Sequence, residues 1–311
     1  MTAAPPTGPD LRARPSWRAT KSAIMLGLMG LAVVAVALPL LAVLASVISR
    51  GAHVAFHDFP AFFTHTVPVV SRKAGPGMGP AILGTLLVTG GATAIAVPLG
   101  VLGAIYLHEY GGARPFARLV RFLATVMTGV PSVVMGLFVY LVWTVTPQLL
   151  ATTPPGEDPE LHGYSAFGGA MALACLMLPV VIGSTEQMLR LVPSSLREAA
   201  YALGASKSRT ILTVVVPAAL PGIVSGALLA VARAAGETAP LLFAVGAATD
   251  WNPHLFTEAN TALSVQIFGN ATSAFPAAQE RAWGAALTLV LLTFLLTLVA
   301  RVVIARRARR S

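Results

Sequence analysis

Charged residues are scarce in this sequence. They make up 11% of its 311 residues, whereas soluble domains carry about 25%. The mean hydropathy is correspondingly high, at +0.76. This composition excludes a soluble globular domain and predicts an integral membrane protein. The alternating segments of about ten residues that a membrane β-barrel needs are also absent from the sequence.

Cysteine and lysine are nearly missing as well. Cys175 is the only cysteine, which excludes an internal disulfide, and it is expected to pack as a small hydrophobe. None of the three lysines follows a Gly-x-x-x-x-Gly run, so ATP must be hydrolysed by another chain. No Ser/His/Asp set suggests catalysis. We therefore expect a chain that is not an enzyme and that carries no cofactor of its own.

The histidines offer one arrangement that resembles a metal site. His53 and His57 have the i,i+4 spacing of metal ligands on a helix, and Asp58 and His65 lie nearby. No other feature of the sequence supports a metal, so no metal site is predicted.

Long apolar runs dominate what is present. We count six, each long enough for a bilayer that needs about 20 residues. Runs of this length are helices, because lipid cannot satisfy the backbone groups of an open sheet edge. The predicted fold class is therefore an all-α integral membrane protein with six transmembrane helices. The runs are roughly Ser22–Val47, Ala81–Leu107, Leu119–Val145, Ser165–Gly183, Ala218–Gly246 and Trp283–Ile304.

The basic residues gather in alternate loops. One set consists of Arg12, Arg14, Arg18, Lys21, Arg114, Arg118, Arg121, Arg190, Arg197, Lys207, Arg209, Arg301, Arg306, Arg307, Arg309 and Arg310. The opposite loops hold only Arg50, Arg72, Lys73 and Arg281, together with most of the acidic residues. The positive-inside rule therefore predicts that both termini are cytoplasmic. These arginine and lysine residues lie at membrane edges, and no nucleic-acid-binding motif accompanies them, which argues against a nucleic-acid partner.

The chain divides into three predicted parts. Residues 1–21 are basic and proline-rich, and we expect a disordered cytoplasmic tail rather than a cleaved signal peptide. Residues 22–305 form the membrane domain, with a cytoplasmic loop at about 186–217. Residues 306–311 form a basic cytoplasmic tail.

A short polar segment within that loop is the most informative feature of the sequence. Glu198, Ala199 and Ala200 are followed by Gly204, and Pro217 closes an apolar stretch thirteen residues later. The alanines favour a helix, the glutamate offers a carboxylate to a partner's cation, and the glycine ends the turn. The segment has the composition of a surface helix that docks into another protein, although an ordinary connector is the simpler alternative.

This spacing resembles the EAA loop found in permease subunits of bacterial ABC importers. Together with Leu189-Arg190-Leu191-Val192-Pro193 before it and Arg233 to Phe243 after it, the segment looks like the PstA-type permeases of phosphate importers. The resemblance implies a type I importer bundle at the bacterial inner membrane. It also implies a second, PstC-like permease, two copies of a PstB-like ATPase that binds ATP and Mg, and a periplasmic or lipid-anchored PstS-like phosphate-binding protein.

Two charges lie inside the fifth apolar run. Arg233 and Glu237 are spaced i,i+4 and share one helix face. A charge in a membrane helix costs about 2.5–3.5 kcal/mol on insertion scales. The pair could be purely structural. Alternatively, Arg233 presents its planar fork of donors to an oxyanion, while Glu237 holds it in place or weakens its grip on the anion.

Glu186 is a third candidate residue of the anion pathway, at the inner end of the fourth run. The resembling family commonly has a basic residue three positions earlier, where this chain has Gly183. Either Arg233 and a partner permease suffice for the anion, or Arg190 supplies the missing charge.

Two other functions remain open at the level of sequence. A permease for molybdate or sulfate would share the architecture and differ in cargo. An ion-coupled secondary transporter would need no ATPase and would show inverted repeats. We find no convincing repeat, and neighbouring genes for an ATPase and a binding protein would distinguish the two classes.

Overall fold

The computed structural model describes residues 17–57, 59–68, 77–112, 114–146 and 163–308. Asp58, Lys73 and much of the two predicted tails therefore lie outside the described residues. Every regular element within them is helical, which confirms the predicted all-α class. The chain divides between Ile48 and Ser49 into two compact units. The first contains most of the long helix α1 (Trp17–His57), which carries Pro39 in its interior.

Five helices are long and apolar enough to cross a membrane. They are α1, α3 (Gly79–Ile105) with its π-helical extension η1 (Tyr106–Gly111), α7 (Ala166–Arg190), the continuous stretch Lys207–Ala235, and α13 (Pro276–Ala308). The third predicted span is not one straight helix. It consists of α4 (Pro115–Gly129), then α5 (Ser132–Tyr140) with η2 (Leu141–Val145), bent by 108° at the junction. Counting this pair as one broken span gives the six crossings that the sequence predicts.

The bend has a local cause at Pro131. A proline pushes the residue before it out of the helical region, and Val130 is accordingly extended, with φ −73° and ψ 128°. Pro131 itself has ψ 135° and precedes the first turn of α5.

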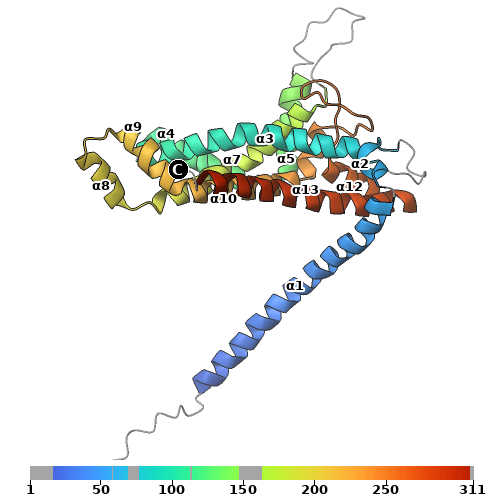
Figure 1. Cartoon of the computed structure of the whole chain (residues 1–311), viewed down its shortest axis with the longest axis horizontal. Coiled ribbons are helices and arrows are strands. Elements are labelled where there is room, and N and C mark those ends of the chain that lie inside the picture. Colours follow the sequence, from blue (N-terminus) through green and yellow to red (C-terminus); the bar gives the residue numbers. More distant parts are fainter. Residues whose placement is uncertain (1–16, 58, 69–76, 113, 147–162, 309–311) are drawn as a thin grey trace, which may run out of the picture. The chain divides into compact units, whose positions relative to one another are not determined.

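The centre of the second unit is built from α3, α7 and the helix α10 (Val216–Ala235). Its buried residues are mostly alanine and valine, with Leu173, Met177 and Leu241 as the larger members. Small residues let transmembrane helices approach closely, and close van der Waals packing is what holds helices together in lipid. Figure 1 shows α3, α7, α10 and α13 running alongside one another.

The contact between α7 and α10 depends on two glycines. A side chain at Gly222 would have its Cβ 2.2 Å from the Met188 sulfur, and one at Gly226 would have it 2.5 Å from the Ser184 hydroxyl. A side chain at Gly226 would therefore push the two helices apart, whereas one at Gly222 would first displace the flexible side chain of Met188. The two helices are held in close contact along their halves nearest the connecting loop.

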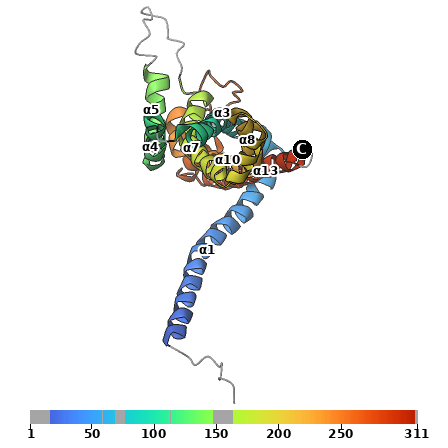
Figure 2. The ribbon, with the colours of Figure 1, turned by 90° about the vertical axis from the view of Figure 1, so that its left-hand side faces the viewer.

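The short elements gather at the two ends of the bundle. The helices α8 (Ser194–Ala202) and α9 (Lys207–Thr210) lie at one end, and α2 (Ala61–Thr64) lies at the other. Figure 2 looks at the bundle from the α8 end.

The end that carries α2 also contains a helix that the sequence analysis did not predict. The segment between α11 and α13 contains α12 (Leu263–Ala271), which packs against α13 and carries buried Gln266 and Asn270. These amides satisfy each other, because Asn270 donates to Gln266 Oε1 at 3.1 Å. A buried polar pair of this kind costs little once it is hydrogen-bonded.

The fifth span begins earlier and ends earlier than the sequence suggested. It starts at Lys207 and continues through the π-helical turn η3 (Ile211–Val215) into α10, which ends at Ala235. Pro217 lacks the N–H that an α-helix would use, and a π turn before it is a common way to accommodate such a gap. After the break at Gly236, the chain resumes as α11 (Ala239–Ala244).

Candidate functional site

The helix α8 contains the Glu-Ala-Ala segment and has no buried residue. Its Glu198 and Ala199 are exposed, and the following Leu203 is 90% exposed. Tyr201 is also exposed. Apolar side chains so fully exposed at the end of a bundle form a surface suited to a partner protein. The structure thus brings the predicted coupling residues Glu198, Ala199 and Ala200 together on one short helix.

Gly204 ends this helix in a conformation that only glycine adopts easily. Its φ is +81°, in the left-handed region. Its N–H donates to the Tyr201 carbonyl at 2.9 Å, and the N–H of Ala205 donates to the Ala200 carbonyl at 3.0 Å. This pair of bonds is the Schellman motif, which satisfies the free carbonyls at a helix end.

We expect Gly204→Ala to loosen the C-terminal turn of α8 by about 1 kcal/mol, because alanine is strained at this φ. Gly204→Asn is the matched control, since asparagine tolerates the left-handed region better. Amide hydrogen exchange of residues 198–205 in the purified complex measures the effect. Equal exchange rates in the wild type and the alanine variant would contradict this account of the turn.

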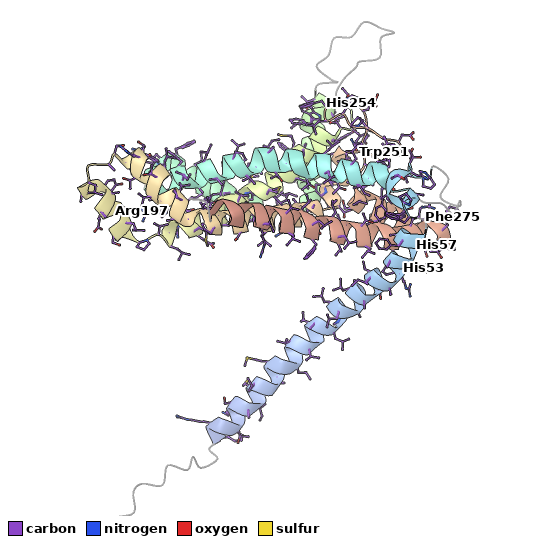
Figure 3. The ribbon with its side chains drawn as sticks, viewed as in Figure 1. His53, His57, Arg197, Trp251, His254 and Phe275 are labelled. Atoms are coloured by element: carbon purple, nitrogen blue, oxygen red, sulfur yellow. The ribbon has the colours of Figure 1, made fainter. Side chains whose placement is uncertain are left out.

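An ion pair that the sequence analysis missed anchors α8 to the bundle. Arg197 donates to Glu109 Oε1 at 3.0 Å, and also to the carbonyls of Leu189 and Val192 at 3.1 and 2.8 Å. The Arg197 and Glu109 side chains are only 18% and 8% exposed. Charge-assisted hydrogen bonds in so sheltered a position are stronger than those at an open surface. Figure 3 shows Arg197 at the α8 end of the bundle.

The η1 turn makes a second contact with the segment that follows α8. Lys207 donates to the backbone carbonyl of Glu109, and its ammonium lies 4.8 Å from the centre of the Tyr110 ring. The turn at the end of the second span therefore contacts both α8, through Arg197, and the first residue of α9, Lys207. One signal in the sequence could have revealed this: Glu109 is the one carboxylate in the strongly basic loop between the second and third spans.

Glu186 belongs to a separate cluster of charges. It accepts from Arg121 Nε at 3.3 Å and from Arg190 Nη2 at 3.0 Å. Arg121 also donates to the carbonyls of Leu107 and Gly112, at 2.6 and 3.3 Å. The cluster joins α4, α7 and the end of the second span. Two arginines thus lie beside Glu186, although this chain has Gly183 at the position where the resembling family commonly has a basic residue.

Arg233 and Glu237 form the ion pair that their spacing suggests. Arg233 Nε lies 3.7 Å from Glu237 Oε1, which is within salt-bridge distance but too long for a hydrogen bond. The Arg233 side chain is 74% exposed and that of Glu237 is 24% exposed. Among the described residues, Glu237 is the only carboxylate in salt-bridge contact with this arginine. The guanidinium therefore keeps most of its donors available.

The break after α10 positions this pair. Arg233 lies in the last turn of α10, whose negative dipole end favours a cation. The next residues leave the helix, and the hydroxyl of Ser264 from α12 donates to the backbone carbonyl of Glu237 at 2.9 Å. The cavity that this chain forms beside the pair measures only about 10 Å³. An anion at Arg233 would therefore need a second chain to enclose it.

The predicted site residues form two groups rather than one. Val180, which lies beside Arg233 and Glu237, is separated from Glu186 along α7 by about 9 Å, at 1.5 Å per residue. Glu186 thus lies towards the α8 end, with the coupling elements. Pro217, expected to close the coupling loop, is inside the fifth membrane helix. Within the described residues, no group of three or more His, Cys, Asp or Glu side chains is placed to hold a metal ion.

Comparison with known proteins gives one family and several close relatives. The model of the family described as binding-protein-dependent transport system inner membrane component matches residues 96–310. The chain is 41% identical over 278 residues to the phosphate transport system permease protein PstA 1 of Mycobacterium tuberculosis (strain H37Rv), covering 88% of this chain and 84% of that protein. It is 36% identical to PstA of Haemophilus influenzae, with 92% and 94% covered.

Solved structures share the fold at lower identity. A bacterial alginate ABC transporter, in complex with an alginate pentasaccharide-bound periplasmic protein, has a chain that aligns with a TM-score of 0.62. The alignment covers 95% of this chain and 99% of that one, at 14% sequence identity. At this identity the likeness concerns the arrangement of helices alone.

Proposed function

Because this chain belongs to the binding-protein-dependent transport system inner membrane component family, we propose that it is a permease subunit of an ATP-driven importer of inorganic phosphate. The main observation that supports phosphate as the cargo is the 41% identity to a phosphate permease over 88% of the chain. The chain is a permease and not an enzyme, as are its relatives. ATP hydrolysis falls to a separate subunit.

The proposed assembly contains two permeases, two ATPase subunits and a binding protein. Family membership supports a transporter complex with an ATPase and a binding protein. A second permease is supported because Arg233 is exposed and this chain encloses almost no space beside it. We assign that second permease as a non-identical, PstC-like chain from the resemblance to phosphate permeases. The ATPases are PstB-like, bind ATP and Mg, and dock on α8. The binding protein is PstS-like and delivers phosphate at the opposite end.

The chain is a multi-pass membrane protein, and we place both termini in the cytoplasm. The distribution of arginine and lysine supports this orientation, since 16 of the 21 basic residues lie in the two terminal segments and in the loops on the same side as α8. In the same orientation, α8 faces the compartment that contains ATP. The last outer loop, which carries Trp251 and His254 (Figure 3), faces the binding protein.

The proposed mechanism follows from how α8 is attached. Closure of the ATPase subunits on nucleotide pushes α8, and the Arg197–Glu109 pair transmits this push to the second span. The α7 and α10 helices continue directly from either side of the α8 segment, so they move with it. This shifts the population between inward-open and outward-open states, powered by the difference in ATPase contacts between them. Arg233 binds phosphate in passing, and Glu237 limits how tightly it is held.

Uptake of radiolabelled phosphate tests the cargo. Cells lacking other phosphate importers would express the chain with its partners, in the presence of excess unlabelled sulfate or molybdate. We expect uptake that requires the partner ATPase and is unaffected by either competitor. If the complex assembles but no ATPase-dependent phosphate uptake occurs, phosphate is not the cargo. Inhibition by molybdate or sulfate would assign the permease to that oxyanion instead.

We expect Glu198→Lys to separate the ATPase from the permease, since it reverses the charge at the centre of the proposed docking surface. Co-purification of the ATPase with the membrane complex measures this, alongside uptake. Glu258→Gln is a control, because Glu258 is exposed in the last outer loop. Normal uptake by the Glu198→Lys variant would refute a docking role for this carboxylate.

A further inference from the structure

The end of α13 that carries Trp283 lies at the level of lipid head groups. No charged residue occurs between Trp283 and Arg301. Their separation is about 27 Å at 1.5 Å per residue, close to the roughly 30 Å of the hydrocarbon core. Tryptophan prefers the interface between lipid and water. The surroundings of Trp283 therefore face the head groups of one leaflet.

A cavity of about 510 Å³ opens at this level between the end of α1 and the start of α13. This volume is within the range of small-molecule sites. Arg50 and His53 line it from α1, and Gln279, Glu280 and Trp283 line it from α13. In Figure 3, His53 and His57 lie beside the start of α13, next to Phe275.

Close packing of the two helices brings these groups together. A Cβ at Gly51 would lie 2.6 Å from the Trp283 carbonyl oxygen of α13, and a Cβ at Gly284 would lie 3.1 Å from Val54 Cγ1 of α1. The absence of a side chain at Gly51 lets the two helices cross at this distance. The Arg50 guanidinium lies 5.2 Å from the centre of the Trp283 ring, which orients it within the cavity.

The cavity presents opposite charges that do not neutralise each other. Within the described part of the chain, no ion pair joins Arg50 to Glu280, and no salt-bridge partner of Glu280 occurs. A guanidinium is suited to a phosphate diester, and a carboxylate is suited to an ammonium group. A purely anionic ligand would be repelled by Glu280, and a purely cationic one by Arg50. A ligand with both charges satisfies both residues.

We propose that this cavity binds the head group of a phosphatidylethanolamine-type lipid. The phosphate lies at Arg50, the primary ammonium group donates to Glu280, and Trp283 lies against the glycerol region. The acyl chains extend along the apolar surface of α13 towards Arg301. This site does not involve the residues of the proposed anion pathway. A test of lipid binding therefore does not depend on whether phosphate is the cargo.

Native mass spectrometry of the purified full-length chain tests this site. The probes are dioleoyl phosphatidylethanolamine and dioleoyl phosphatidylglycerol, which share the phosphate but differ in the amine. We expect the Kd for phosphatidylethanolamine to be about tenfold lower, from one charge-assisted hydrogen bond. Glu280→Gln should abolish this preference, and Arg50→Gln should weaken binding of both lipids about tenfold.

Matched controls and a soluble probe complete the test. Glu258→Gln and Arg118→Gln remove the same charges from exposed positions outside the cavity and should change neither Kd. A preference that survives Glu280→Gln, or tighter binding of phosphatidylglycerol, would overturn the proposal. Displacement of the lipid by glycerophosphoethanolamine at equal concentration would assign the site to a soluble zwitterion and overturn the lipid assignment.

Discussion

Phosphate uptake is expected to fall at least about 100-fold in Arg233→Gln, while the transporter remains assembled. Glutamine cannot supply the charged, two-pronged donor set, and losing two charge-assisted hydrogen bonds costs about 3 kcal/mol or more. Assembly should persist, because the Arg233 side chain is 74% exposed and packs little against its own chain. Radiolabelled uptake and co-purification of the subunits measure the two effects. Loss of assembly would favour a purely structural pair.

Two further variants separate contact with the anion from support of the helix. Arg233→Lys keeps the charge but loses the planar fork, so uptake should return only in part. Glu237→Gln removes the partner carboxylate, which should lower the KM for phosphate and slow turnover, because the anion is held more tightly. A structural ion pair would make Glu237→Gln as harmful as Arg233→Gln, with no fall in KM.

Arg197→Gln is expected to uncouple ATP hydrolysis from transport. Removing one partner of a sheltered ion pair costs about 3 kcal/mol, so the ratio of attached to detached α8 falls about 100-fold. The ATPase subunits should then hydrolyse ATP at their basal rate without stimulation by the phosphate-loaded binding protein. Parallel measurements of ATPase rate and phosphate uptake in proteoliposomes test this.

The partner of Arg197 provides the comparison. Glu109→Gln should impair coupling to a similar degree, whereas the double variant should recover part of it, because no uncompensated charge remains. Recovery stays incomplete, since Arg197 also donates to two backbone carbonyls. Arg118→Gln, at an exposed position of α4, should behave as the wild type. Normal coupling in Arg197→Gln would exclude the pair as a link.

The features that the sequence predicted are those with a local signature. Apolar runs of membrane length predicted the long helices, and the Glu-Ala-Ala segment predicted a helix ended by Gly204. The i,i+4 spacing of Arg233 and Glu237 predicted their contact. Each depends on residues that are close in the sequence. Arg233 and Glu237 still meet although Glu237 lies just beyond the end of α10, because only Gly236 separates it from the helix.

The features that it missed depend on distant pairs or on compensation. Glu109 and Arg197 are 88 positions apart, and no local pattern joins them. The helix α12 was not predicted because Gln266 and Asn270 are polar and therefore suggest an exposed loop. They can be buried only because they hydrogen-bond to each other. The fifth span was expected to begin after Pro217, which reads locally as a helix breaker. A π turn lets the helix continue through it, so the membrane segment starts eleven residues earlier, at Lys207.

The two glycine contacts between α7 and α10 have a mechanical consequence. At Gly222 and Gly226 the backbone of α10 lies close against Met188 and Ser184 of α7. We expect this contact to keep the two helices together when α8 is displaced. A movement of α8 would then be passed along α10 towards the end that carries Arg233.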